Sequence, residues 1–177
     1  VPDYLVQGKD TVAIFNNPLE QYFDKVGKRE LIDFKNACWS TACWRGYRAY
    51  WELTNDSLYL IKITSCHEDC GESKDANLYA MFGEDRPFAS WYNGTLTAPM
   101  GELFSGSDMG YNAIFEFEDK LQIVNGVLKS KQRISNIELI EQIKLDNKLY
   151  AQIPTLKDTL LFHLNKNIDW EKKDNTN

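Results

Sequence analysis

The sequence predicts an α+β protein that is mainly antiparallel β, arranged as a hairpin-linked meander or barrel-like sheet with two or three short helices. Residues 43–63 alternate in strand fashion on both sides of a polar turn at residues 55–56. A second tight-turn dipeptide, Asn-Gly at residues 125–126, separates two further apolar runs. Strand-like runs follow one another through short turns, whereas a parallel sheet would need a helix between successive strands.

The N-terminal region should contain an extended lead-in, one short strand and one helix. Residues 1–15 are expected to be extended, with a polar turn at residues 7–10 and a short strand after it. Asn17 is a favoured helix N-cap, Pro18 suits the first helical position, and Glu20 stands three residues after the cap. These signals predict a helix that ends at the next glycine.

The first strand of the central hairpin has one face that should be buried. Tyr47, Ala49 and Trp51 share that face by their alternation. We expect Trp51 and Trp44 to be structural. Arg45 is expected to be partly buried and satisfied by backbone carbonyls or a carboxylate, because a buried charge needs partners.

The remaining elements follow from the same rules of turn residues and periodicity. In chain order, the expectations are a helix at 77–82, a strand at 88–97 turned back at 98–101, a flexible loop at 105–110, strands at 111–117, 121–124 and 127–134 with a turn at 118–120, an ambiguous segment at 137–145, a strand-like segment at 149–153 and a helix at 155–164. Residues 1–164 are predicted to be a single globular domain, and residues 165–177 a polar, frayed tail.

Composition limits the classes of partner. The net charge is -6, and the 20 basic residues are mixed with the 26 acidic ones instead of forming a stripe, which argues against nucleic-acid binding. No run approaches the ~20 apolar residues needed to span a bilayer. The sequence begins at Val1 rather than Met, which fits removal of an export signal or of a lipoprotein leader that would anchor the unprocessed form to lipid.

The four cysteines favour disulfides. Cys43 and Cys66, and likewise Cys38 and Cys70, lie nearly opposite each other across the predicted hairpin, within the shift that one bulge introduces. Free thiols and a four-cysteine zinc site are the alternatives, but neither cysteine spacing is the two-residue spacing typical of zinc. Paired cysteines persist in oxidising compartments, so the pairing also predicts a periplasmic or outer-membrane-anchored protein.

No catalytic motif, metal site or cofactor is predicted. The run from Cys66 to Cys70 crowds thiols, a histidine and carboxylates together, but five consecutive residues cannot all face one ion, and a solvated loop tied by a disulfide is favoured. The chain has two histidines and contains neither G-x-S-x-G nor H-E-x-x-H. A converging pair of carboxylates for glycoside cleavage stays open, since sequence spacing does not test it.

Aromatic and polar side chains supply the candidate binding residues. They are Trp91, Tyr92, Asn93, Trp39 and Arg48, which could form a surface for a carbohydrate or a protein. The alternative is that some of these aromatic rings belong to the core.

Two blocks of sequence resemble a group of small, uncharacterised bacterial proteins. The matching segments are STACWRGY at 40–47, WEL at 51–53, LYL at 58–60, ASWYNGTL at 89–96 and MGY at 109–111. The resemblance covers roughly residues 11–127, and its motifs look structural. It implies an exported protein, and by analogy a protein like the immunity proteins of contact-dependent toxin systems.

The sequence therefore supports two functional hypotheses. The first is a non-enzymatic protein that binds a toxin or effector, most concretely an immunity protein in the periplasm. The alternative is an exported carbohydrate-binding or carbohydrate-active module that uses Trp91 and Tyr92 as stacking residues.

Overall fold

The computed structural model describes residues 1–27, 43–66, 74–105 and 113–152 of the 177-residue chain. The chain divides into two units, residues 1–136 and residues 137–177, and each is described by itself. The domain end predicted at residue 164 lies outside the described residues.

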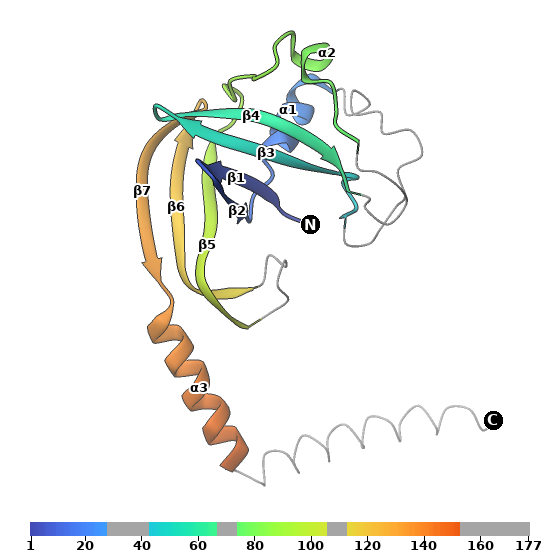
Figure 1. Ribbon diagram of the computed structural model, residues 1–177. Coiled ribbons are helices and arrows are strands. Elements are labelled where there is room, and N and C mark those ends of the chain that lie inside the picture. Colours follow the sequence, from blue (N-terminus) through green and yellow to red (C-terminus); the bar gives the residue numbers. More distant parts are fainter. Residues whose placement is uncertain (28–42, 67–73, 106–112, 153–177) are drawn as a thin grey trace, which may run out of the picture. The chain divides into compact units, whose positions relative to one another are not determined.

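One seven-stranded sheet dominates the first unit (Figure 1). Its strands are β1 (Asp3–Gln7), β2 (Asp10–Ile14), β3 (Tyr47–Thr54), β4 (Ser57–Ser65), β5 (Gly94–Ser105), β6 (Ile114–Val124) and β7 (Val127–Ser135). The sheet order is β2-β1-β3-β4-β7-β6-β5, and every pair is antiparallel except β1 with β3. The predicted class, α+β with a mainly antiparallel sheet, is confirmed.

The two end strands of this sheet approach each other without pairing as strands. Just after β2, the backbone N–H of Phe15 donates to the carbonyl of Thr97 in β5 at 2.9 Å. The N–H of Thr97 in turn donates to Oδ1 of Asn16 at 2.7 Å. The sheet is therefore open, but it curves far enough to bring its first and last strands together at one point.

Both predicted tight turns are present. Asn55 and Asp56 have φ values of 48° and 58°, and Asn125 and Gly126 have φ values of 51° and 77°. Positive φ at both central positions is the type I′ geometry whose twist matches that of a hairpin. A bulge between Tyr50 and Trp51 shifts the β3–β4 register by one residue.

The course of β5 corrects two predictions. Residues 88–93 are not strand, apart from an isolated bridge between Phe88 and Tyr59. The predicted turn at 98–101 is wrong, because β5 runs through Pro99 and bulges after Met100. Proline is tolerated here because β5 lies at the end of the sheet order, where one side of the strand needs no partner.

Two later predictions are also wrong. Residues 118–120 do not turn, because β6 is continuous and pairs with β7 through that stretch. The described part of the segment at 149–153, predicted as strand-like, belongs to a helix, α3 (Ile137–Gln152). The segment at 137–145, which the sequence left open between strand and helix, is part of the same helix. The helix predicted at 155–164 and most of the loop predicted at 105–110 lie outside the described residues.

Within the described residues of the first unit, two helices begin and end close to the predicted positions. Helix α1 (Pro18–Val26) ends at Gly27, which has a left-handed conformation and donates its N–H to the carbonyl of Phe23 at 2.8 Å. The side chain of Asn17 makes no capping hydrogen bond to α1. Helix α2 (Leu78–Phe82) is capped by Asn77, whose Oδ1 accepts from the N–H of Ala80 at 2.9 Å.

The hydrophobic core lies between the sheet and these helices. Tyr47, Ala49 and Trp51 are buried as their alternation predicts, and Trp51 is 0% exposed. The largest other fully buried apolar side chains are Leu5, Ile14, Leu19, Leu58, Leu60, Ile63, Leu96, Leu121 and Ile123. Among the described residues, no helix has the length and apolar character required to cross a membrane.

Replacing Trp51 by Ala should lower the free energy of unfolding by about 3 kcal/mol or more, because a cavity is left in addition to the lost transfer energy. Chemical denaturation measures this difference. Tyr50→Ala is the matched control, because Tyr50 lies on the opposite face of β3 and is only half-buried. Equal losses in the two variants would contradict the assignment of faces.

Candidate functional site

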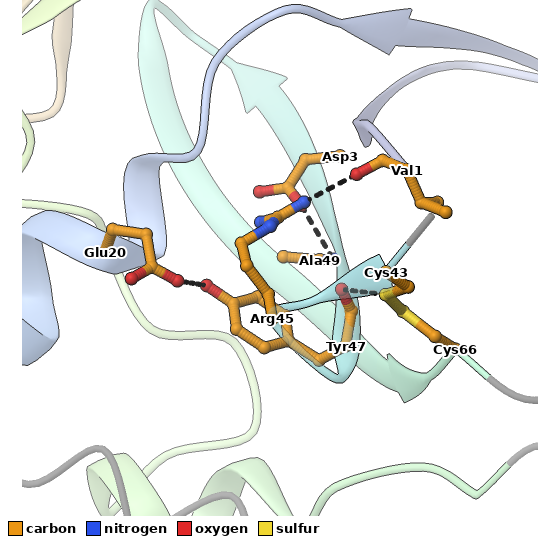
Figure 2. Close-up of a disulfide and its surroundings, with 8 residues drawn as sticks. All are labelled: Val1, Asp3, Glu20, Cys43, Arg45, Tyr47, Ala49 and Cys66. Carbon is orange, nitrogen blue, oxygen red and sulfur yellow. Dashed lines mark hydrogen bonds and ion pairs between the residues drawn. A yellow bond between two sulfur atoms is a disulfide. The ribbon is translucent and has the colours of Figure 1, made fainter. Parts of the chain in front are cut away.

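The strongest cluster of charged groups is centred on Asp3, the first residue of β1. Oδ1 of Asp3 accepts from Nη1 of Arg45 at 2.8 Å and from the N–H of Ala49 at 3.2 Å. Oδ2 accepts from Nε1 of Trp51 at 3.3 Å. The carboxylate of β1 thus holds the start of β3 through three donors, two of which, Arg45 and Ala49, are drawn in Figure 2.

Arg45 extends this network toward α1. Its Nη2 donates to the carbonyl of Val1 at 2.8 Å, and its guanidinium carbon lies 4.8 Å from the centre of the Tyr47 ring. The hydroxyl of Tyr47 then donates to Oε1 of Glu20 at 2.5 Å. The prediction that Arg45 is satisfied by carbonyls or a carboxylate is confirmed, since its partners include the Asp3 carboxylate and the carbonyl of Val1.

Burial governs the electrostatics of this cluster. The side chains of Arg45 and Asp3 are 2% and 0% exposed. Burial raises the pKa of Asp3, while Arg45, the amide of Ala49 and the indole of Trp51 oppose that rise. Burial also raises the pKa of Tyr47, and Asp3 and Glu20 add to the effect. Because water does not reach the Asp3 carboxylate and its donors are engaged internally, this ion pair joins β1 to the turn before β3.

The disulfide between Cys43 and Cys66 closes the open end of the β3–β4 hairpin, as predicted. Its Cα atoms are 6.2 Å apart. Cys43 lies in a turn ahead of β3, where the N–H of Gly46 donates to its carbonyl at 3.0 Å. The N–H of Cys66 donates to the carbonyl of Gly46 at 3.3 Å, so the same turn is bonded to the residue after β4.

Trp44 projects from this turn and corrects the expectation that it is structural. Cys43 and Arg45, its neighbours on either side, are buried, but Trp44 is 60% exposed. The disulfide and the Arg45–Asp3 pair therefore fix the backbone on both sides of a large exposed aromatic ring.

Two of the predicted binding residues belong to the core. Trp91 is 9% exposed, its Nε1 donates to the carbonyl of Pro18 at 3.2 Å, and its ring stacks on Phe82 with centroids 5.6 Å apart. Tyr92 is also buried, which raises its pKa to about 12. Neither ring has a face open for stacking on a sugar, because both are buried, Trp91 against Tyr22 of α1 and Phe82 of α2.

The other predicted binding residues do not join them. Asn93 is exposed, but its backbone is hydrogen-bonded to the side chain of Gln21 in α1. Its carbonyl accepts from Nε2 of Gln21 at 2.9 Å, and its N–H donates to Oε1 at 3.0 Å. Arg48 is half-buried on the face of β3 opposite to Tyr47. Trp39 lies outside the described residues. The described residues of the predicted set thus attach α1 to the sheet or lie elsewhere, and they do not converge on one surface.

A second charged cluster lies on β6 and β7. Asp119 faces Arg133 across the ladder and accepts from its Nε at 2.6 Å and from its Nη2 at 2.9 Å. Lys131 lies 3.3 Å from the same carboxylate. The hydrogen bond from Arg133 is the main cause of the lowered pKa of Asp119. This cluster explains why residues 118–120 continue as strand.

The part of the chain that the structure describes contains no group of three or more His, Cys, Asp or Glu side chains able to hold a metal ion. The proposed Cys38–Cys70 disulfide and the cysteine-rich run after Cys66 lie outside those residues. Family models, curated proteins and solved structures were all compared with the chain, and none matches it. Functional inference therefore depends on the chain's own geometry.

Sequence analysis did not assign the carboxylates of buried Asp3 and half-buried Glu20 to this network. A signal for Asp3 was present, because it shares a strand face with the fully buried Leu5. A charged residue in the inward phase of a strand indicates a buried partner, and Arg45 had already been identified as needing one. Nothing in the spacing points from Glu20 to Tyr47.

Removing one partner of the buried pair should destabilise the fold strongly. Asp3→Leu or Arg45→Met alone should each lower the free energy of unfolding by about 3–5 kcal/mol, because the remaining charge stays buried without its counter-ion. The double variant Asp3→Leu with Arg45→Met should lose less than the sum of the two. Chemical denaturation of all four proteins measures this coupling, and additive losses would show that the pair does not act as a unit.

Reduction of the disulfide should lower the melting temperature. The bridge joins residues separated by 23 positions, for which the chain-entropy model gives about 3 kcal/mol of stabilisation. Non-reducing peptide mapping should recover Cys43 and Cys66 in one linked pair of peptides. Alkylation of both thiols in unreduced protein would contradict the pairing.

Proposed function

We propose that this chain is a non-enzymatic protein-binding protein, and more specifically an exported immunity protein that neutralises a secreted bacterial toxin or effector. The observation that carries the proposal is the exposed indole of Trp44 on an immobilised turn. The immunity role adds the analogy drawn from the family resemblance at residues 40–47.

Trp44 has the properties of an interface anchor. Tryptophan is enriched among the few residues that contribute most of the binding energy at protein interfaces. Because the backbone of Trp44 is held by the Cys43–Cys66 bridge and by buried Arg45, little backbone freedom remains to be lost when a partner binds. A large exposed ring on a rigid turn therefore favours a binding role over a purely structural one.

The charged groups support a binding role over catalysis. The carboxylates with shifted pKa values in the described residues are Asp3 and Asp119, and each is held by basic side chains of the same chain. A catalytic acid or base needs a free position facing its substrate. Export is supported by the disulfide, because such bonds persist in oxidising compartments.

The carbohydrate-binding alternative loses the two rings on which it rested. Trp91 and Tyr92 are packed in the core, and Trp91 contacts α1 through the carbonyl of Pro18. A glycan array tests what remains of it, since specific sugar binding that depends on Trp44 would favour the alternative over a protein partner.

The proposal predicts that a partner captured from the source bacterium depends on Trp44. Immobilised chain should retain a secreted toxin or effector from that organism, and Trp44→Ala should reduce its affinity at least tenfold, as expected when an interface anchor is truncated. Tyr79→Ala is the matched control, because Tyr79 on α2 is similarly exposed, at 61%.

Neutralisation is the decisive measurement. Activity of the captured toxin should fall when native chain or Tyr79→Ala is added, and it should persist with Trp44→Ala. The proposal fails if no secreted protein is retained, or if the Trp44 and Tyr79 variants lose binding equally.

A further inference from the structure

Strand β7 has a long edge that no described residue of the first unit pairs with. On one side β7 pairs with β6 along its length. On the other side it meets β4 only at Val127 and Ser57, and the N–H of Leu128 donates to the carbonyl of Asp56 at 2.7 Å. Figure 1 shows the two strands diverging from this shared end. From Lys129 to Ile134, alternate backbone N–H and C=O groups therefore point away from the sheet.

The neighbouring strand β4 differs, because its outer side is not open. The outer side of β4 is covered by short segments, through hydrogen bonds that join Leu60 to Pro87, Ala89 to Leu58 and Ala76 to Ile63. These bonds leave little of the outer side of β4 available to a partner. Of the two strands that diverge here, β7 therefore has the longer open edge.

The charge on this edge is opposite to that of the whole chain. Residues 127–135 contain Lys129, Lys131 and Arg133 and no acidic residue, in a chain of net charge -6. Lys131 and Arg133 are 51% and 55% exposed at their side chains, while the Asp119 carboxylate between them is 7% exposed. Two exposed cations share one buried anion, so the rim of β7 presents positive charge to solvent.

We propose that the β7 edge binds an extended acidic segment of a partner protein, which adds an eighth strand to the sheet. Peptides commonly bind in this way, with main-chain hydrogen bonds supplying affinity and alternate side chains supplying specificity. Lys131 and Arg133 lie on one face, because their ladder partners Leu121 and Asp119 do. An added strand would meet both cations with acidic residues at positions i and i+2.

The charge pattern also decides between occupants. A second copy of the chain would pair β7 with β7 and set Lys129, Lys131 and Arg133 of one copy against those of the other. Like charges directly opposite each other destabilise strand pairing. Lysines on an edge also discourage indiscriminate aggregation, and the same charges leave an acidic strand as the favoured partner. This surface is separate from the Trp44 turn, and the inference does not depend on the function proposed for that turn.

Synthetic peptides test the inference directly. The probe is a short capped peptide in which glutamate alternates with valine, and its affinity for the full chain is measured by fluorescence anisotropy at low salt. One control peptide has the same composition with its glutamates at adjacent positions. A second control carries N-methyl groups at alternate amides, which block strand pairing without changing the charge.

The alternating peptide should bind more tightly than both controls, and binding should weaken as salt is added. Lys131→Ala should reduce the affinity roughly two- to fivefold, the range for one exposed ion pair. Lys9→Ala is the matched control because Lys9 is exposed on the β1–β2 turn. Hydrogen exchange should show new protection of alternate amides between residues 129 and 134.

Three outcomes would overturn the proposal. They are equal binding of the three peptides, protection confined to another part of the chain, and self-association through β7, which would assign the edge to a second copy. Trp44→Ala should leave peptide binding unchanged, so a failure of the Trp44 proposal and a failure of this one are distinguishable.

Discussion

The buried carboxylate of Asp3 is the constraint on which the first unit depends. A carboxylate removed from water is unfavourable unless a counter-charge and several donors replace its hydration. Arg45, the amide of Ala49 and the indole of Trp51 provide that replacement, and all three come from β3 or the turn before it. Satisfying one side chain therefore aligns β1 in parallel with β3, which is the one parallel pair in an otherwise antiparallel sheet.

This arrangement separates the groups that stabilise the fold from the groups that face a partner. The first set lies inside, where Arg45 and the Cys43–Cys66 bridge hold the turn before β3 from two directions. Trp44 lies between them and is left outside, because the side chains on both sides of it point inward. The β6–β7 pair shows a similar separation, because the Asp119 carboxylate is buried whereas its partners Lys131 and Arg133 are exposed to solvent.

The Cys43–Cys66 disulfide was predicted correctly, although the geometric argument for it was incomplete. Cross-strand register placed Cys43 almost opposite Cys66, with a bulge making up the difference. The bulge between Tyr50 and Trp51 exists, but Gly46 is the residue bonded to Cys66. A turn over residues 43–46 then brings Cys43 back next to Cys66, where the disulfide forms. The geometry of this turn depends on the ion pair between Arg45 and Asp3. An argument from the pairing register of two strands does not include that contact.

The sequence by itself determined the local elements: both type I′ turns, the buried face of β3, and the ends of α1 and α2. Each depends on neighbouring residues, through backbone preference at the turns and side-chain alternation along the strands. Tertiary structure alone decided that Pro99 could lie within β5, which follows from that strand's place at the end of the sheet. It also decided that Trp91 is core and Trp44 is surface. Residue type alone does not distinguish these two tryptophans. Only the packing of distant segments, such as the hydrogen bond from Trp91 to the carbonyl of Pro18, distinguishes the core residue from the surface one.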